Sequence, residues 1–289
     1  MSKPKILIQL DSSPHASAFD AVVAIDAGVD QLLRYHGVRP EDVEALVHGA
    51  IFTRGPEDLQ RTAIFVGGTD VSAAEAILRR VIACFLGPLR VSVLLDPNGA
   101  NTTAAAAVVA AGRHMPLGEA TAVVLGASGP VGQRVVRLLA RQGARVRVGS
   151  RNHSRAVSVC EAVCACVPPA RLEPYQTATP DQTATALAGA HVVIAAGAAG
   201  VELVASEAWR HAESLRVAID LNAVPPPGIA GIEPLDRAAD RDGVITYGAI
   251  GVGALKMKIH KAAIARLFKR NDQVLDAEAV YAIGCERAP

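Results

Sequence analysis

One segment, residues 122–149, constrains the fold of this chain more than any other. It reads AVVLGASGPVGQRVVRLLARQGARVRVG: an apolar run, a glycine-rich turn, a helical pattern and a second β-rich run. Gly126, Gly129 and Gly132 lie in the turn. Strand, glycine-rich turn, helix and strand in this order form the βαβ unit that binds dinucleotides in α/β proteins. The segment therefore predicts a parallel sheet with a phosphate-binding turn after its first strand.

The glycines of this turn have different expected roles. Gly129 would let the backbone approach a pyrophosphate, and Gly132 would let the helix pack closely against the strand. Amide groups at the start of the helix would bind phosphate oxygens. In a strict G-x-G-x-x-G pattern the first glycine would fall at Ala127, whereas this chain has it at Gly126. An ordinary glycine-rich turn is the alternative interpretation.

The end of the second strand indicates which dinucleotide is bound. An NAD enzyme usually places an acidic residue there for the ribose hydroxyls. Residues 149–155 read GSRNHSR and contain no acid. Arg151 and Arg155 could bind a 2′-phosphate together with Ser150, because a guanidinium matches phosphate geometry; solvated residues at a helix start are the alternative. We therefore expect NADP as the cofactor, with NAD possible. The predicted cofactor-binding residues are Gly126, Ser128, Gly129, Pro130, Val131, Gly132, Ser150, Arg151, Arg155, Ala196, Gly197 and Asn222.

Short β-rich runs alternate with helical patterns along the whole chain, which is typical of an α/β protein with parallel sheets. Strands are predicted at residues 6–10, 62–66, 91–95, 122–125, 145–148, 191–195 and 216–220. Helices are predicted at residues 18–27, 40–51, 70–86, 101–112, 254–269 and 276–283. The polar stretch around Pro116 separates two such series. We predict two α/β domains, residues 1–112 completed by 254–289 and a Rossmann-type dinucleotide-binding domain at 113–253.

Composition excludes several classes of partner. The 29 basic and 28 acidic residues give a net charge of +1, which provides no electrostatic footprint for nucleic acid or an anionic membrane. The longest apolar run, residues 192–201, is about half of the ~20 residues that a spanning helix needs. The apolar run at residues 6–10 is too short for a signal-peptide core. We expect a cytoplasmic protein without nucleic-acid or membrane partners.

The five cysteines are the residues that most invite a metal interpretation. An odd number of cysteines suits reduced thiols in a reducing compartment. Cys160, Cys164 and Cys166 share one predicted helix, but Cys164 and Cys166 point to different faces of it. We therefore expect buried or semi-buried free thiols and no metal site.

Several further segments have an unusual composition. They are residues 18–28 (AFDAVVAIDAG), 96–106 (DPNGANTTAAA) and 248–260 (GAIGVGALKMKIH), with shorter matches at 53–55, 65–68 and 220–226. In order and spacing, over nearly the whole chain, these segments resemble the bacterial NAD(P)-dependent methylenetetrahydromethanopterin dehydrogenases. The Lys256-x-Lys258-x-His260 sequence looks more like the NADP-dependent branch of that family.

The resemblance implies a fold and a reaction. It implies a pterin-binding domain at residues 1–112 with 254–289, a Rossmann domain, and a substrate site in the cleft between them. The implied reaction of one-carbon metabolism, in methylotrophs and some relatives, is hydride transfer from the methylene bridge of methylenetetrahydromethanopterin to the nicotinamide. The family also suggests a homo-oligomer, either a trimer or a hexamer. No metal is required for this reaction.

The resemblance also implies roles for particular residues. Lys256 matches the family's active-site lysine, and we expect it to orient the pterin. Asp20 could pair with Lys256 or lie near the developing positive charge; a surface carboxylate is the alternative. Candidate substrate-binding residues are Asp96, Asn98, Asn101 and His260. Their alternatives are structural: Asp96 would set a turn, Asn101 would cap a helix, and His260 would be a packed histidine.

Two other functions fit the same sequence. One is a different NADP oxidoreductase on this two-domain plan, such as a methylenetetrahydrofolate or shikimate-type dehydrogenase. The other is a non-enzymatic NADP-sensing module, because a fold alone does not establish catalysis.

Overall fold

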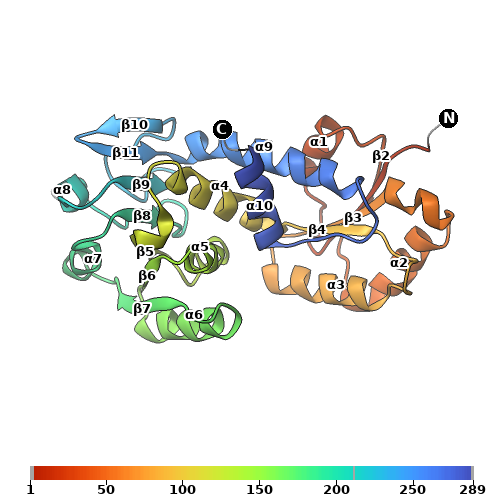
Figure 1. Ribbon diagram of the computed structural model, residues 1–289, viewed down its shortest axis with the longest axis horizontal. Coiled ribbons are helices and arrows are strands. Elements are labelled where there is room, and N and C mark those ends of the chain that lie inside the picture. Colours follow the sequence, from red (N-terminus) through yellow and green to blue (C-terminus); the bar gives the residue numbers. More distant parts are fainter. Residues whose placement is uncertain (1–2, 211, 288–289) are drawn as a thin grey trace. The chain divides into compact units, whose positions relative to one another are not determined.

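A computed structural model describes residues 3–210 and 212–287 of the chain (Figure 1). The chain divides into two compact units, Met1–Thr102 with Met257–Pro289 and Thr103–Lys256. The boundaries fall inside helices α4 (Ala100–Gly112) and α9 (Ala249–Leu267). The sequence placed these boundaries at 112 and 253. Each unit is built on its own largely parallel sheet covered by helices, so the predicted α/β class with two domains is confirmed.

The first unit contains a parallel five-stranded sheet in the order β12-β4-β3-β1-β2. The strands are β1 (Ile6–Asp11), β2 (Gln31–Tyr35), β3 (Thr62–Gly67), β4 (Ser92–Leu95) and β12 (Val274–Leu275). The helices are α1 (Ala18–Asp26), α2 (Val43–Ile51), α3 (Val71–Ala83) and α10 (Ala277–Arg287), together with parts of α4 and α9. Short 3₁₀ turns lie at Pro40–Asp42, Pro56–Arg61 and Pro97–Gly99. The predicted helix at residues 40–51 is thus a 3₁₀ turn followed by α2.

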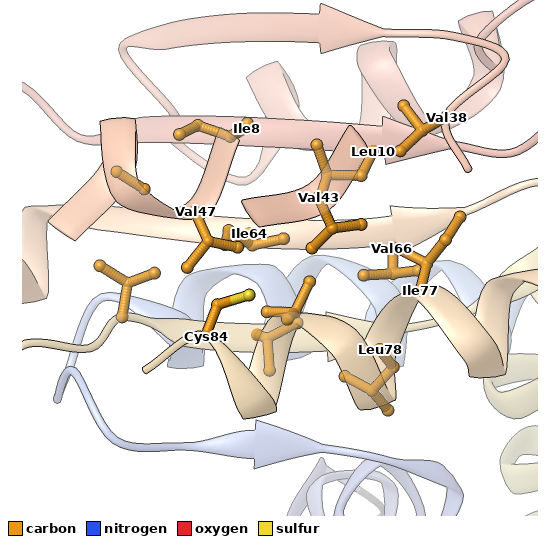
Figure 2. Close-up of a cluster of buried hydrophobic side chains, with 14 of the residues drawn as sticks. Ile8, Leu10, Val38, Val43, Val47, Ile64, Val66, Ile77, Leu78 and Cys84 are labelled. Atoms are coloured by element: carbon orange, nitrogen blue, oxygen red, sulfur yellow. The ribbon is translucent and has the colours of Figure 1, made fainter. Parts of the chain in front are cut away.

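The core of this unit follows from the strand register. Ile8 pairs with Ile64 and Leu10 with Val66, so these four side chains lie on one face of the sheet. Val43 and Val47 of α2 and buried residues of α3 pack on that face, as Figure 2 shows. The opposite face meets α1 and α9. Helices therefore cover both faces of the sheet, and the carboxyl ends of its strands remain the place for functional loops.

The second unit contains a seven-stranded sheet in the order β10-β11-β9-β8-β5-β6-β7. The strands are β5 (Thr121–Leu125), β6 (Arg145–Ser150), β7 (Arg171–Gln176), β8 (Val192–Ala195), β9 (Val217–Asp220), β10 (Arg237–Arg241) and β11 (Val244–Tyr247). The helices are α5 (Pro130–Arg141), α6 (His153–Cys166), α7 (Pro180–Leu187) and α8 (Ser206–Arg210), and a 3₁₀ turn lies at Leu117–Glu119. The sheet is parallel except for β10, which forms an antiparallel hairpin with β11. An antiparallel edge strand on an otherwise parallel sheet is common in α/β proteins.

Strand order positions the functional end of this sheet. The chain runs outward from β5 through β6 to β7, and then returns to add β8 and β9 on the other side of β5. The direction of strand addition therefore reverses between β5 and β8. Ligands of open α/β sheets bind outside the carboxyl ends of the strands at such a reversal.

Candidate functional site

A cavity of about 610 Å³ lies in the second unit where β5, β6 and β8 end. It is lined by Gly126, Ser128, Gly129, Pro130, Ser150, Arg151, Asn152, Arg155, Thr177, Ala196, Gly197, Ala198, Val201 and Leu203. A cavity of this volume suits a small-molecule or cofactor site. Nine of the twelve residues predicted to bind the cofactor line it; Val131, Gly132 and Asn222 do not. The structure thus brings together the turn after β5 and the loops after β6 and β8.

The turn after β5 depends on two glycines for steric reasons. Gly126 has a left-handed φ of +68°, and a Cβ there would lie 2.6 Å from the Cα of Gly197. A Cβ on Gly132 would lie 2.5 Å from the carbonyl oxygen of Gly126 and 2.7 Å from the Cα of Ala127. By contrast, a Cβ on Gly129 would meet nothing closer than 3.4 Å. Gly126 and Gly132 are therefore required by packing, whereas Gly129 has room around it within the protein.

This difference predicts separable effects of two alanine substitutions. Gly132→Ala should lower the free energy of unfolding by about 1–3 kcal/mol, because backbone atoms must shift to accept the methyl group. Gly129→Ala should lower the free energy of unfolding by under about 1 kcal/mol, because alanine is a poorer residue than glycine at the position before a helix. It should nevertheless weaken dinucleotide binding about tenfold by blocking close approach of the backbone. Denaturant unfolding and calorimetric titration measure the two effects. Equal destabilisation by both substitutions would contradict the assignment.

The amino terminus of α5 points its backbone groups at a place where an anion can bind. The helix begins at Pro130 after Gly129, has no acidic residue in its first turn, and receives no hydrogen bond from a capping side chain. The first N–H groups of a helix lack partners within it and carry partial positive charge. Val131 and Gly132, which are not part of the cavity lining, contribute such N–H groups. This arrangement fits the phosphate-binding role expected for the turn.

The residues after β6 give the cavity its charge. Ser150 is buried, and its hydroxyl lies 3.4 Å from that of Ser128 and accepts a hydrogen bond from the Asn152 N–H at 3.3 Å. Arg151 and Arg155 are exposed, and neither forms an ion pair within residues 3–210 and 212–287. No acidic side chain lines the cavity. Two guanidinium groups beside an acid-free cavity favour a ligand with an additional phosphate.

Asn222 lies outside the cavity lining and connects two loops. Its side-chain oxygen accepts hydrogen bonds from the N–H groups of Gly200 (3.3 Å) and Val224 (3.0 Å), and its NH₂ donates to the Pro226 carbonyl (2.9 Å). The nearby Asp220 carboxylate is buried and accepts hydrogen bonds from Asn222 and Gly228. Burial raises the pKa of Asp220, an effect that these N–H donors oppose. Asn222 therefore supports the loop after β8, and direct contact with a cofactor stays a prediction.

Sequence reasoning missed five residues of the lining: Asn152, Thr177, Ala198, Val201 and Leu203. Thr177 directly follows β7, and its N–H donates to the Ser150 carbonyl at 2.9 Å. Pro174 lies within β7, so the sequence pattern does not indicate a strand there. Proline is nevertheless tolerated on an edge strand. Recognising β7 would have placed Thr177 beside Ser150, because the carboxyl ends of adjacent parallel strands meet at one edge of a sheet.

The predicted substrate-binding residues after β4 divide into two kinds. The Asp96 carboxylate is fully buried and accepts hydrogen bonds from the Asn101 and Thr102 N–H groups and from the Thr102 hydroxyl at 2.6 Å. The Asn101 side chain donates to the Leu95 carbonyl at 2.6 Å. Asn98, in contrast, is exposed and has a left-handed φ of 52°. Asp96 and Asn101 thus hold the start of α4, and Asn98 is the one of the three that presents its side chain outward.

The buried carboxylate after β4 leads to a stability prediction. Asp96→Ala should lower the free energy of unfolding by about 2–3 kcal/mol, because N–H groups at the start of α4 lose a charged acceptor. Asn98→Gly, which keeps the left-handed backbone conformation accessible, is the matched control and should change stability little. Urea unfolding monitored by circular dichroism compares them. A change of under about 0.5 kcal/mol for Asp96→Ala would refute the capping role.

Asp20, Lys256 and His260 differ in their surroundings. Asp20 lies in the first turn of α1 and is 9% exposed, so it is a buried rather than a surface carboxylate. His260 is fully buried on α9, with ring centroids 6.4 Å from Phe19 and 5.9 Å from Phe65. Lys256 is half-buried one helical turn before His260, on the same face of α9, and Lys258 is exposed. The aromatic contacts describe His260 as a packed side chain.

Cys160, Cys164 and Cys166 differ in burial, so the expectation of buried or semi-buried thiols is confirmed for Cys160 and wrong for the other two. Cys160 is buried, and burial raises the pKa of its thiol to about 11; Cys164 and Cys166 are exposed. Across the residues that the structure describes, no group of three or more His, Cys, Asp or Glu side chains could hold a metal ion. None of the helices in this part of the chain has the length and apolar character needed to cross a bilayer.

Comparison with known proteins places the chain in a family. A family model for the N-terminal part of methylene-tetrahydromethanopterin dehydrogenase matches residues 18–98. The chain is 42% identical to the bifunctional protein MdtA of Methylorubrum extorquens, over 100% of both chains. It is 31% identical to the NAD(P)-dependent methylenetetrahydromethanopterin dehydrogenase of the same organism, over 98% of both. The chain belongs to the NAD(P)-dependent methylenetetrahydromethanopterin dehydrogenase family.

This membership confirms the resemblance drawn from the sequence segments. The match at residues 18–98 includes Asp20, Asp96 and Asn98. Among solved structures, quinate dehydrogenase from Corynebacterium glutamicum in complex with NAD is similar with a TM-score of 0.52 and 14% identity, over 97% of this chain and 98% of that one. The 5-ketofructose reductase of a Gluconobacter strain has the same TM-score at 13% identity, over 98% of both chains. These two likenesses show that this chain shares its fold with the two enzymes.

Proposed function

We propose that this chain catalyses reversible transfer of a hydride from the methylene bridge of methylenetetrahydromethanopterin to NADP, giving the methenyl product. The observation that carries this proposal is the full-length similarity to a relative named for that activity. The acid-free cavity at the carboxyl ends of β5, β6 and β8 supports it independently, because it has the parts that a dinucleotide needs.

The residues of the cavity fit NADP in three respects. The N–H groups at the start of α5 would hold the pyrophosphate. The close packing of Gly126 and Gly132 against neighbouring backbone keeps the turn before this helix tight. Arg151 and Arg155 would bind the 2′-phosphate beside Ser150. Val201 and Leu203 add an apolar wall. When bound, NADP supplies the nicotinamide ring that accepts the hydride.

The reaction requires little acid–base catalysis from the protein. The methenyl product is a cation delocalised over two nitrogens, so no proton must move in the hydride step. The chain's residues then have to orient the pterin and exclude water. We assign orientation of the pterin to Lys256 and Asn98, and we assign Asp20 to balance the positive charge that develops on the pterin. On this proposal the first unit supplies the substrate domain and the second the dinucleotide domain.

We further propose that the protein acts as a cytoplasmic homo-oligomer, a trimer or a hexamer. The near-neutral charge supports the absence of nucleic-acid and membrane partners. The oligomer follows from the family resemblance described above. Light scattering of the purified protein would measure the number of subunits.

Initial rates with two substrates and two cofactors test the proposed function. The purified protein is mixed with methylenetetrahydromethanopterin or methylenetetrahydrofolate, each with NADP or NAD, and reduced cofactor is followed by absorbance. We expect the pterin with NADP to give the highest rate. The folate is included because a methylenetetrahydrofolate dehydrogenase on the same two-domain plan is the alternative function. A higher rate with the folate would favour the alternative dehydrogenase, and NADP binding without turnover of either substrate would favour the sensing module.

A further inference from the structure

Residues 233–236, just before β10, supply hydrogen-bond acceptors to the start of helix α9, and we call them the capping segment. Helix α9 follows β11 directly, with Gly248 between them (Figure 1). The Gly248 N–H donates to the Asp236 carbonyl, and the Ile250 N–H donates to the Pro234 carbonyl, each at 2.9 Å. The first N–H groups of a helix lack partners within it. Here the backbone of the capping segment provides partners for them.

Two glycines allow the capping segment to approach α9 this closely. A Cβ on Gly248 would overlap the carbonyl oxygen of Glu233, and a Cβ on Gly251 would overlap the carbonyl oxygen of Asp236. Because these oxygens belong to the backbone, neither position could accept a side chain unless the helix moved. Both glycines come from the unusual segment 248–260, and neither lines the dinucleotide cavity. They leave the start of α9 only one place against the capping segment.

The side chain of Asp236 connects the capping segment to the sheet of the second unit. Its carboxylate is 7% exposed and accepts two hydrogen bonds from the Arg241 guanidinium, at 2.6 and 2.7 Å. It also accepts hydrogen bonds from the Thr246 hydroxyl at 2.9 Å and from the Glu233 N–H at 3.1 Å. Thr246 lies on β11 and pairs with Ala218 of β9. Burial opposes the charge of Asp236, but the hydrogen bonds from Arg241 and Thr246 lower its pKa below the usual value.

We propose that Asp236 is a positioning residue for Lys256. This inference rests on the proposed function, in which Lys256 orients the pterin. Lys256 lies about two helical turns after the start of α9, and hydrogen-bonded turns of a helix move together. A shift of the first turn therefore carries Lys256 with it. A displacement of about 1 Å at a group that orients a substrate can lower the rate about 100-fold.

The geometry of Asp236 suits positioning better than it suits stabilisation. A buried ion pair contributes little net stability, because removing both charges from water offsets their attraction. A guanidinium that donates two hydrogen bonds to one carboxylate nevertheless fixes its distance and its orientation. Asp240, on β10 of the same hairpin, is exposed and accepts a hydrogen bond from the Gly243 N–H at 2.9 Å. Asp240 thus provides a matched control, because it is a carboxylate outside the capping segment.

A double-mutant cycle tests whether Asp236 acts through Lys256. Asp236→Ala should lower kcat with the pterin and NADP about tenfold and leave the Kd of NADP within about twofold. In a Lys256→Ala background the same substitution should lower kcat by less than about twofold, because the group that it positions is already gone. Asp240→Ala should change neither quantity. An unchanged kcat for Asp236→Ala, or a tenfold loss in both backgrounds, would overturn the proposal.

Amine labelling follows the surroundings of Lys256 without any substrate. The protein is treated briefly with limiting N-hydroxysuccinimidyl acetate, and mass spectrometry gives the labelling of Lys256 relative to the exposed Lys258. Asp236→Ala should change this ratio severalfold, and Asp240→Ala should leave it as it is. An unmodified protein that does not turn over the pterin would contradict the proposed function, whereas an unchanged ratio in Asp236→Ala would contradict the role of Asp236.

Thr246→Val is a milder variant in case Asp236→Ala does not fold. It keeps the branched shape of the side chain and removes one hydrogen bond to Asp236. Circular dichroism checks that the variant is folded. It should lower kcat about threefold in the unmodified protein and leave it unchanged in the Lys256→Ala background. A folded Thr246→Val protein with the original kcat and labelling ratio would also overturn the proposal.

Discussion

Replacing Arg151 by alanine is expected to raise the dissociation constant for NADP about 10- to 100-fold and to leave that for NAD nearly unchanged. The guanidinium is exposed beside an acid-free cavity and has no ion-pair partner within the described residues, so its charge is available to a 2′-phosphate. NAD lacks that phosphate, so the substitution removes no interaction from the NAD complex. Calorimetric titration of both cofactors against the same protein preparation measures the two constants.

Arg145→Ala is the control for a general effect of charge. Arg145 lies at the amino end of the same strand, β6, where it pairs with Glu173 at 3.6 Å, away from the cavity lining. Its removal should change neither dissociation constant. If Arg151→Ala weakened NADP and NAD equally, Arg151 would support the loop rather than read the 2′-phosphate.

Lys256→Ala is expected to lower turnover of methylenetetrahydromethanopterin about 100-fold or more while NADP affinity stays within about twofold. Lys256 is half-buried on α9 and is not part of the cavity that we assign to the dinucleotide. Loss of a group that orients the pterin should therefore affect the reaction and not cofactor binding. Steady-state rates and a cofactor titration on the same variant separate the two quantities.

Two further variants make this result interpretable. Lys258→Ala removes a neighbouring, exposed lysine on another face of α9 and should leave turnover unchanged. Lys256→Gln keeps a hydrogen-bond donor and should recover part of the lost rate. Thermal unfolding of all three variants detects any loss of fold. A fully active, folded Lys256→Ala protein would remove Lys256 from the mechanism.

The sequence predicted those parts of the fold whose side chains are buried on both faces. β1, β3, β5 and β8 are nearly continuous apolar runs, and each was located. β2 and β7 are edge strands with mostly exposed or half-buried side chains, so they lack this pattern. β12 is two residues long and gains its place only by pairing with β4. Tertiary pairing, rather than local pattern, determines these strands.

The candidate site divides along similar lines. The glycine turn could be located because its steric needs are local, and Gly126 and Gly132 have backbone atoms where a Cβ would lie. Whether Asp96 binds a ligand or a helix end could not be decided from residue type, because a carboxylate suits both. Its three hydrogen bonds to Asn101 and Thr102 became visible only in three dimensions. Thr177 required knowledge of β7.

In the proposed reaction a hydride passes from the methylene carbon of the pterin to NADP. Methylenetetrahydromethanopterin with both hydrogens of the methylene bridge replaced by deuterium tests it most directly, with mass spectrometry of the reduced cofactor as the readout. We predict one deuterium in each NADPH molecule formed by the purified protein. Reduced cofactor without deuterium, or no reduction of NADP at all, would contradict the proposed reaction.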